Sequence, residues 1–348
     1  MRIDAESVAS YAEGCAILGT GGGGDIRVPL LIARAALAAG PVAVVSPDDL
    51  PDDALVLPVG GWGAPTVCSE KFDAGTEAAS LVAQAEAWFG RRVDALMPSE
   101  IGGGNGVTPV AWAAELGLPL VDADAMGRAF PEGDMCAMHI VGLPPSPAFF
   151  ADERGWSCAV GPVDAVGLER EARAIVERCG GVVAGADHPM DAATVRTATV
   201  RGTVTLAAGI GAALVADGLE GVLRATGGRQ LAEAKVVDVE RVTGGGFARG
   251  VVRLEGTGPD VGRAIAVDVQ NENLVAREDG ALIASTPDLI VIADRESGRA
   301  IPTERVRYGQ RIALLGLPCA PIWRTPRGLE IAGPERFGYP GPWRPVEA

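Results

Sequence analysis

The stretch VDALMPSEIGGGNGVTPVAWAAELGLPLVDAD, residues 93–124, decides the class of fold. Residues 93–100 are a short apolar run that predicts a strand, and residues 108–117 have the apolar spacing of a helix. Residues 118–124 predict a second strand, which again ends on acidic side chains. A strand, a helix and a strand in this order predict two parallel strands that are joined by a covering helix.

The same alternation of helices and strands extends toward the N-terminus, whereas the C-terminal part changes character. Helical patterns cover residues 5–19, 26–40 and 76–90, and strand-like runs cover residues 41–46 and 54–61. After Arg229 the segments are short and rich in Val and Ile, which is typical of β-strands. We therefore expect an α/β plus β fold, with a mainly parallel α/β domain over residues 1–165 and a mixed, then β-rich and barrel-like domain over residues 166–348.

The composition narrows the class of function. The 348 residues carry a formal net charge of −15, which disfavours nucleic acid and anionic membrane surfaces as partners, because both need clustered Lys and Arg. The sequence has no run of about 18 apolar residues and no evident signal peptide, so we expect no transmembrane helix. The six cysteines are scattered without a CxxC motif, which favours free thiols and a cytoplasmic location.

Four glycine-flanked segments stand where ligands bind in α/β proteins, close to the ends of predicted elements. They are residues 18–25 (LGTGGGGD), 60–71, 98–106 and 122–132, and they carry the carboxylates Asp25, Glu70, Glu100, Asp122 and Asp124. Carboxylates that are brought together raise one another's pKa, bind a cation or activate water. The alternatives are a plain C-cap turn for the glycines and helix N-caps for Asp122 and Asp124.

The glycine run Gly21, Gly22, Gly23 and Gly24 is the most unusual of these features. No GK[ST] follows it, so it is not a nucleotide-binding P-loop. A backbone without side chains lets a flat polar ring come close, and its N–H groups can face the heteroatoms of that ring. We therefore expect the run to form one wall of a crevice, so that Gly22→Ala or Gly23→Ala damages activity more than stability.

Few side chains are available for a metal site or for nucleophilic catalysis. His139 and His188 are the only histidines, which excludes a zinc site of three histidines within one chain, and no GxSxG motif is present. His188 follows a predicted strand and is the better ligand candidate, whereas His139 is expected in the core. Cys68 and Cys319 are further candidates, although a single cysteine is more often a small buried hydrophobe.

Eight motifs, in their order along the chain, resemble those of the S-methyl thiohydantoin desulfurase family. They are ILGTGGGGD, GAPTVCSEK, PSEIGGGNG, GLPLVDADAMGRAFPE, VQNENLVA, TPDLIVIAD, TERVRYGQR and GPERFGYP, and they extend from about Ala16 to Tyr339. The resemblance implies a two-domain enzyme that acts on a thiohydantoin or hydantoin-like ring. One branch of the family resembles the zinc-containing desulfhydrase of ergothioneine breakdown, which converts the C=S of 3-(5-oxo-2-thioxoimidazolidin-4-yl)propionic acid to C=O and releases hydrogen sulfide.

On the basis of this resemblance we assign catalytic, substrate-binding and zinc-binding roles to the candidate residues. The catalytic carboxylates are Glu70, Glu100, Asp122 and Asp124, with Glu100 or Asp122 as the general base. The substrate-binding residues are Gly21, Gly22, Gly23, Gly24, Asn105, Arg128 and Asn271, and Arg128 is expected to hold a substrate carboxylate. The zinc ligands are Cys68, His188 and Cys319, and Cys68 is alternatively a nucleophile that takes sulfur directly. For Asn271 a solvated turn is the alternative.

Two other functions stay open at this point. One is hydrolysis of a hydantoin or oxoproline ring, by this chain alone or as a subunit of a larger hydrolase. The other is a non-catalytic partner that carries a hydantoin-like ligand. In each case we expect a small heterocyclic ligand and a homo-oligomer, without nucleic acid or membrane.

Overall fold

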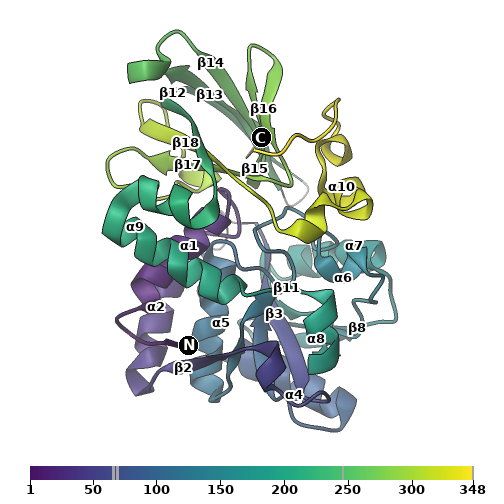
Figure 1. Cartoon of the computed structure of the whole chain (residues 1–348). Coiled ribbons are helices and arrows are strands. Elements are labelled where there is room, and N and C mark those ends of the chain that lie inside the picture. Colours follow the sequence, from purple (N-terminus) through teal and green to yellow (C-terminus); the bar gives the residue numbers. More distant parts are fainter. Residues whose placement is uncertain (65–66, 68–69, 245–246, 347–348) are drawn as a thin grey trace.

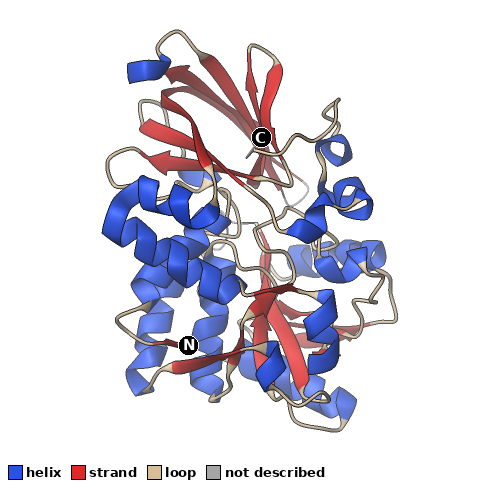
Figure 2. Cartoon of the chain, viewed as in Figure 1, coloured by secondary structure: helices blue, strands red, loops and turns tan. Residues whose placement is uncertain are grey.

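The computed structural model of the chain describes residues 1–64, 67, 70–244 and 247–346. It contains two large sheets, one in each half of the molecule, and loops of the two halves meet between them (Figure 1, Figure 2). The N-terminal half combines helices with a sheet that has parallel strands, and the C-terminal half is an antiparallel, curled sheet. The expected fold class, α/β plus β, is therefore confirmed.

The sheet of the N-terminal half has the strand order β1-β2-β5-β4-β3-β9-β7-β8, with β10 paired to β3. The strands are β1 (Arg2–Ile3), β2 (Val42–Val45), β3 (Leu55–Gly63), β4 (Ala95–Pro98), β5 (Leu120–Val121), β7 (Ala148–Ala151), β8 (Ser157–Val160), β9 (Val182–Ala186) and β10 (Met190–Asp191). Within the described residues the parallel pairs are confined to β2, β5, β4 and β3, so the sheet is mixed. The sheet also does not end at residue 165, because β9 and β10 pair with β3.

The helices around this sheet have ends that the sequence explains. They are α1 (Val8–Leu18), α2 (Arg27–Ala36), α4 (Glu77–Phe89), α5 (Gly104–Leu116), α6 (Ala137–Ile140), α7 (Ala165–Arg178), α8 (Ala192–Ala198) and α9 (Thr203–Thr226). Gly90 and Gly117 end α4 and α5 with the left-handed backbone that C-cap glycines adopt. Asp164 caps the first turn of α7 by accepting a hydrogen bond from the Gly167 N–H.

Helix α9 is the one helix of the described residues that is long and apolar enough to cross a membrane. One such helix is weak evidence for a membrane span, since the core helix of a globular protein has the same composition. Here α9 packs along α1, and the approach is so close that a Cβ at Gly211 would lie 1.7 Å from the Ser10 carbonyl oxygen. Packing against α1 therefore accounts for part of the apolar surface of α9.

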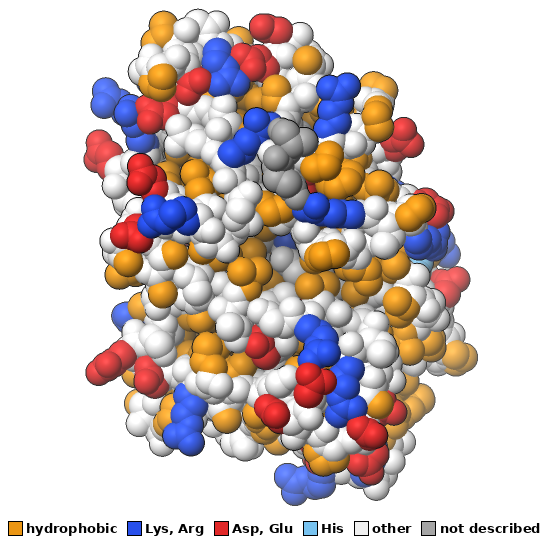
Figure 3. All heavy atoms as spheres, viewed as in Figure 1, with side chains coloured by type: hydrophobic (Ala, Val, Ile, Leu, Met, Phe, Trp, Pro, Cys, Tyr) orange, Lys and Arg blue, Asp and Glu red, His pale blue; other side chains and the backbone are white. Residues whose placement is uncertain are grey.

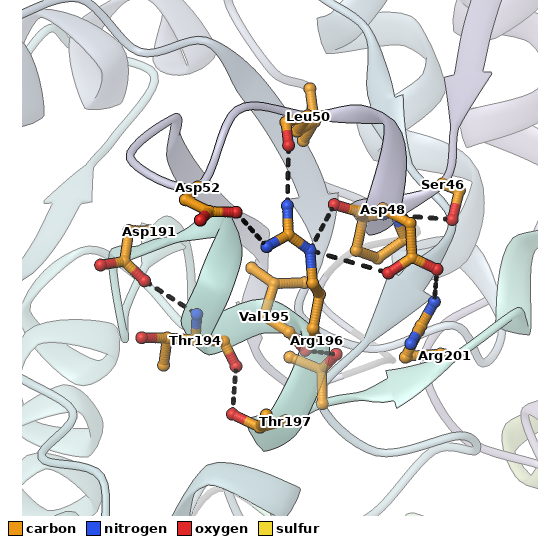
Figure 4. A network of polar contacts seen from close by, with 12 residues as sticks. Ser46, Asp48, Leu50, Asp52, Asp191, Thr194, Val195, Arg196, Thr197 and Arg201 are labelled. Carbon is orange, nitrogen blue, oxygen red and sulfur yellow. Dashed lines mark hydrogen bonds and ion pairs between the residues drawn. The ribbon is translucent and has the colours of Figure 1, made fainter.

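Helix α8 is fixed to the N-terminal half by a network around Arg196 (Figure 4). The Arg196 guanidinium donates to the carbonyl oxygens of Pro47 and Leu50. It also pairs with the Asp52 carboxylate at 2.6 Å. Because α8 directly follows β10, this network also fixes the segment 187–191 that leads into the helix.

The C-terminal half is a seven-stranded antiparallel sheet with the order β16-β15-β14-β13-β12-β18-β17. Its strands are β12 (Arg229–Gly244), β13 (Phe247–Gly256), β14 (Ala264–Gln270), β15 (Glu272–Glu278), β16 (Ala281–Ser285), β17 (Leu289–Asp294) and β18 (Arg311–Leu317), and helix α10 (Pro326–Ala332) follows. Along β17 the side chains alternate between two cores. Leu289 and Val291 join the core of the N-terminal half, whereas Ile290 and Ile292 face the concave core of the curled sheet.

Charged side chains of both signs are interspersed on the face of the molecule seen in Figure 3. Lys and Arg side chains lie near Asp and Glu side chains over both halves. Hydrophobic side chains are scattered between them, as on most protein surfaces. This face therefore has no extended area of a single charge.

Candidate active site

A cavity of about 100 Å³ lies where the C-terminal ends of β3 and β4 meet the C-terminal half. Its lining combines glycines, carboxylates and a few apolar side chains: Gly23, Gly24, Gly60, Gly61, Trp62, Gly63, Ser99, Glu100, Asn105, Ala125, Met126, Phe130, Pro131, Gly133, Cys136, Arg173, Asp187, Asn271 and Glu272. The ends of parallel strands are where α/β proteins bind ligands. Of the residues that the sequence selected, Gly23, Gly24, Glu100, Asn105 and Asn271 line this cavity.

Glu100 follows β4 and presents a buried carboxyl group to the cavity. Its side chain accepts a hydrogen bond from the Asn105 amide (2.9 Å) and one from the Phe130 N–H (3.1 Å). Asn105 is itself held by Gly61 of β3, because its amide both accepts from the Gly61 N–H and donates to the Gly61 carbonyl oxygen. Burial outweighs these hydrogen bonds and raises the pKa of Glu100 to about 7. Glu100 is therefore poised to exchange protons near neutral pH.

A second carboxyl group, from Glu272 of β15, faces Glu100 across the domain boundary. Glu272 is 2% exposed, and burial followed by the nearby Glu100 carboxylate raises its pKa well above the ordinary value. Arg128 and the Gly23 N–H act in the opposite direction. Because two carboxylates that are close together resist full ionisation, the pair Glu100 and Glu272 retains a proton at neutral pH.

Two buried polar atoms of the cavity lining have no hydrogen-bond partner among the described residues. They are the Ser99 hydroxyl oxygen and the Oε2 atom of Glu272. Buried polar groups in folded proteins are nearly always hydrogen-bonded, so each exception calls for an explanation. Both residues line the cavity, so a polar ligand bound there would lie close to them.

The four glycines of the run at residues 21–24 have two different surroundings. Gly23 and Gly24 line the cavity, whereas Gly21 and Gly22 pack against the C-terminal half. A Cβ at Gly22 would lie 1.9 Å from Oε1 of Glu272, and the Gly21 carbonyl oxygen accepts a hydrogen bond from the Thr303 N–H. The run is thus a contact between the halves as much as a wall of the cavity, which the sequence alone did not indicate.

A cysteine, a histidine and an aspartate lie next to one another beside this cavity. His188 Nε2 lies 4.0 Å from Cys136 Sγ, and His188 Nδ1 lies 2.5 Å from Asp187 Oδ1. All three side chains are buried, and Cys136 and Asp187 line the cavity. Burial on its own lowers the pKa of His188, but Cys136 and Asp187 outweigh it and raise the pKa to about 10. His188 therefore contacts a thiol and a carboxylate rather than a second expected zinc ligand.

Asp122 and Asp124 are placed outside this cavity lining. Asp124 is fully buried and accepts hydrogen bonds from the N–H groups of Ile101, Met126 and Gly127, so it joins the loops that follow β4 and β5. Burial raises its pKa to about 7. Asp122 accepts from the N–H and hydroxyl groups of Thr205 in the first turn of α9. Both carboxylates thus anchor other segments, but the N-cap alternative does not hold for the residues that directly follow them, because residues 125–130 are not helical.

Arg128 is also placed outside the lining. Its guanidinium is 1% exposed and donates to the carbonyl oxygens of Ala129, Pro287 and Asp288 and to the Thr20 hydroxyl. Because these donors are engaged by the protein, the placement does not fit the expected contact with a substrate carboxylate. It makes Arg128 a clamp between the two halves.

Arg173 of α7 is the cation that does line the cavity. Its guanidinium donates to Glu169 at 2.6 Å and to the Pro131 carbonyl oxygen at 3.0 Å. It also lies 4.7 Å from the centre of the Phe247 ring, which comes from the C-terminal half. Arg173 is therefore the positively charged side chain of this lining that could bind an anionic ligand.

The remaining residues that the sequence predicted for the site, Glu70, Cys319 and Cys68, are not brought together at the cavity by the described structure. Glu70 is exposed and outside the lining. Cys319 is a buried thiol next to Asp288, and burial raises the pKa of this thiol to about 12. Cys68 lies outside the described residues. Among the residues that the structure describes, no group of three or more His, Cys, Asp or Glu side chains is arranged to hold a metal ion. The described donors therefore do not fit the expected zinc ion, and we assign no step to it.

Asn271 forms the sharp turn between β14 and β15. It has a φ of +58°, a left-handed conformation that Asn tolerates better than most residues, and its carbonyl oxygen accepts a hydrogen bond from the Thr303 hydroxyl. It is 5% exposed and lines the cavity, so the alternative of a solvated turn does not describe it. Its place in the turn brings the next residue, Glu272, to the cavity.

A larger cavity of about 590 Å³ adjoins the first one and shares Gly23, Gly24, Gly61 and Asn105 with it. Its further lining includes the apolar side chains Val28, Leu31, Ile32 and Trp112 and the cations Arg27, Lys71 and Arg305. The shared residues therefore place the two cavities next to each other.

Sequence reasoning did not select Cys136, Asp187 or Arg173. These residues come from the loop before α6, the end of β9 and the middle of α7, and no spacing links them. Asp187 directly precedes His188, which was the one available signal. Glu272 stood inside the polar run QNEN, but nothing in that run indicated which side chain would face a cavity.

Comparison with known proteins agrees with the two-part architecture. The S-Me-THD-like N-terminal domain family matches residues 6–161, and the S-Me-THD-like C-terminal domain family matches residues 163–346. A crystal structure of a protein from Chromobacterium violaceum is similar, with a TM-score of 0.82 and 26% sequence identity over 99% of this chain and 100% of that chain. No curated protein matches the chain. Because the two family matches extend over nearly all of the sequence, the chain belongs to the S-Me-THD-like family.

Proposed function

We propose that the chain is an enzyme that uses water to replace the C2 sulfur of a thiohydantoin ring by oxygen, with release of hydrogen sulfide. The family description, S-Me-THD-like, points to thiohydantoin chemistry. The observation that carries the proposal is the buried carboxyl pair Glu100 and Glu272 in one cavity, where Oε2 of Glu272 and the nearby Ser99 hydroxyl oxygen have no hydrogen-bond partner among the described residues. A small polar ring fits such a cavity better than a phosphate or a polymer does.

In the proposed reaction Glu100 is the general base. It accepts a proton from the water that attacks C2, and its pKa of about 7 suits that exchange at neutral pH. Asn105 holds the Glu100 carboxylate in place through the 2.9 Å hydrogen bond, so that the water meets a fixed acceptor. The protonated partner of the pair, Glu272, and the Ser99 hydroxyl are donors for the charge that develops on the ring and its sulfur.

The proposed substrate is 3-(5-oxo-2-thioxoimidazolidin-4-yl)propionic acid. Its carboxylate needs a cation, and the Arg173 guanidinium lies in the cavity lining. The alternative substrates are rings without the propionate, for which Arg173 would contribute little.

The experiment is to incubate the purified full-length enzyme, with and without added zinc, with this propionic acid and separately with unsubstituted 2-thiohydantoin. Sulfide is measured colorimetrically, and the organic product is identified by mass spectrometry. We expect sulfide and the corresponding hydantoin in equal amounts, with the propionate turned over faster than the unsubstituted ring.

Two other results would contradict the proposed reaction, and a third would contradict the role of Glu100 as its base. Ring-opened product without sulfide selects a hydantoin or oxoproline hydrolase. Calorimetric binding without turnover selects a ligand-carrying partner. Sulfide release only in the presence of zinc, with Glu100→Gln as active as the wild type, transfers the activation of water from Glu100 to a metal.

A further inference from the structure

The alignment of Cys136, His188 and Asp187 has the geometry of an activated thiol. A nucleophile within reach of a base, and a third group that orients the base, are the signature of covalent catalysis. Here His188 Nε2 lies 4.0 Å from Cys136 Sγ, and His188 Nδ1 lies 2.5 Å from Asp187 Oδ1. The sulfur contact is long for a hydrogen bond, and catalytic hydrogen bonds of this kind tighten when the substrate binds.

The backbone holds His188 in this orientation at a cost. His188 has a φ of +49°, a left-handed conformation that is strained for a residue with a side chain. Its N–H donates to the Pro145 carbonyl oxygen, and β10, two residues later, pairs with β3. A strained conformation persists only where the surroundings enforce it, and such residues cluster at functional sites.

The thiol also shares its cavity with the carboxyl pair. Cys136 and Asp187 belong to the same lining as Glu100 and Glu272. One ring bound in this cavity would therefore meet a nucleophile and a base for water at the same time. The other described cysteines do not combine these features, since none of Cys15, Cys158, Cys179 and Cys319 lines the cavity.

We propose that Cys136 is the covalent nucleophile of this enzyme, activated by His188, which Asp187 positions. The inference rests on the proposed desulfurisation and adds an intermediate to it. The reaction then proceeds in two steps on C2, and sulfur leaves before water enters.

In the first step the Cys136 thiolate adds to C2 and the C=S electron pair moves onto the ring sulfur. That sulfur takes one proton from the His188 imidazolium and one from the ring N–H, and leaves as hydrogen sulfide while a C2=N bond forms. C2 is then bound to Cys136 as a thioether, and His188 is neutral. No oxidant or reductant takes part.

In the second step water adds to the same carbon. Glu100 accepts one water proton and delivers it to the ring nitrogen, and His188 accepts the other as the C2=O bond forms. The C2–Sγ bond breaks and Cys136 leaves as a thiolate. The site returns to its initial thiolate and imidazolium, and the sum of both steps is C=S plus water to C=O plus hydrogen sulfide.

The first experiment compares wild type, Cys136→Ser, Cys136→Ala and the control Cys158→Ser, which alters a half-buried thiol outside the cavity. The substrate is 2-thiohydantoin, and the readouts are sulfide release and the intact mass of acid-quenched enzyme. We expect both Cys136 variants to lose roughly 10³–10⁶ in kcat. The wild type and Cys158→Ser should carry a ring adduct that peptide mapping places on Cys136. Normal melting temperatures of the variants exclude a folding defect.

Two outcomes overturn the inference while the proposed function stands. One is a folded Cys136→Ala variant that releases sulfide at the wild-type rate. The other is an adduct on a different residue. If the wild type itself releases no sulfide, the proposed function fails. The activation of Cys136 by His188 and Asp187 is then tested only by the next experiment, which needs no substrate.

The second experiment measures the reactivity of the thiol without substrate. Iodoacetamide at pH 7 should alkylate Cys136 faster than Cys158 in the same molecule, and Asp187→Asn should slow only Cys136, because the imidazole loses its orienting carboxylate. With the substrate, Asp187→Asn should lose about 10²–10⁴ in kcat. A purely structural role of Asp187 would leave the ratio of the two alkylation rates unchanged, and that result would refute its positioning role.

Discussion

Glu100 shows how one residue acquires its chemistry from its surroundings. A glutamate in water titrates near 4.3, whereas burial beneath the cavity raises the pKa of Glu100 to about 7. The neighbours act in both directions, because Asn105 and the Phe130 N–H stabilise the carboxylate and Asp124 opposes it. The proton of this group is therefore exchangeable near neutral pH, which is unusual for a glutamate.

From this we predict the pH dependence of the reaction. A general base works in its deprotonated form, so kcat/KM should be low below pH 7 and should rise as the pH passes through about 7. Glu100→Gln should lose about 10²–10⁴ in kcat and should also lose the rise. The control is Glu115→Gln on α5, outside the cavity, which should keep both. An unchanged pH profile in Glu100→Gln would remove Glu100 from the role of base.

Single residues also show where sequence reasoning succeeds and where it stops. Glu100 and Asn105 could be selected because they flank three glycines directly after a predicted strand, where ligands bind. Asp124 ends the next strand in the same way, yet its carboxylate turns toward backbone N–H groups. Which side of a loop a carboxylate faces depends on contacts between loops, and no local pattern records those contacts.

At the scale of elements, the glycine run connects the two halves. The Thr20 carbonyl oxygen accepts from the Asn273 N–H, and the carbonyl oxygens of Gly23 and Gly24 accept from the N–H groups of Asn105 and Gly104. The run therefore pairs with β15 on one side and with the start of α5 on the other. A side chain is excluded here mainly by other parts of the protein.

This arrangement changes what we expect from Gly22→Ala. The new Cβ would lie 1.9 Å from Glu272 Oε1, so Glu272 must move, and both stability and activity should fall, with about 1–3 kcal/mol lost from the free energy of unfolding. Gly209→Ala is the matched control, because this helical position of α9 is open and alanine there should add roughly 0.5–1 kcal/mol. Urea unfolding and sulfide release measure the two effects. A variant Gly22→Ala that loses activity alone would restore the simpler role of a cavity wall.

The elements themselves were largely predictable from the sequence. Up to residue 121, helices α1, α2, α4 and α5 and strands β2, β3, β4 and β5 lie close to where the apolar spacing placed them, and α4 ends at the glycine that closed its pattern. The mixed character of the sheet was not predictable, because β7, β8 and β9 are short and their direction depends on pairing, β9 with β3, β7 with β9 and β8 with β7. Pairing between strands that are distant in sequence leaves no mark on either strand.

At the scale of the whole molecule, the two halves share one core. Leu289 and Val291 of β17 pack into the same cluster as Leu57 and Val59 of β3. The active-site cavity lies at this junction, since Glu100 comes from one half and Glu272 from the other. A cavity built in this way exists only while the halves are joined, so binding and stability are linked.

Arg128 tests that link directly. It belongs to the N-terminal half, and its Nη1 atom donates to the carbonyl oxygens of Pro287 and Asp288 in the other half at 2.9 and 2.8 Å. Arg128→Met keeps the apolar bulk but leaves the carbonyl oxygens of Pro287 and Asp288 and the Thr20 hydroxyl without their donor. We expect a loss of about 3–5 kcal/mol in the free energy of unfolding, because each buried acceptor that loses its donor costs about 1–3 kcal/mol.

The measurement is urea unfolding, followed by fluorescence and by far-ultraviolet circular dichroism. The wild type should unfold in one transition by both probes, because the halves share a core and a clamp. Arg128→Lys should recover only part of the loss, since an ammonium group cannot reproduce the fork of the guanidinium toward Pro287, Asp288 and Thr20. If Arg128→Met were as stable as the wild type, the shared core alone would hold the halves together. The cavity would then owe its shape to packing between β17 and the first sheet rather than to charge.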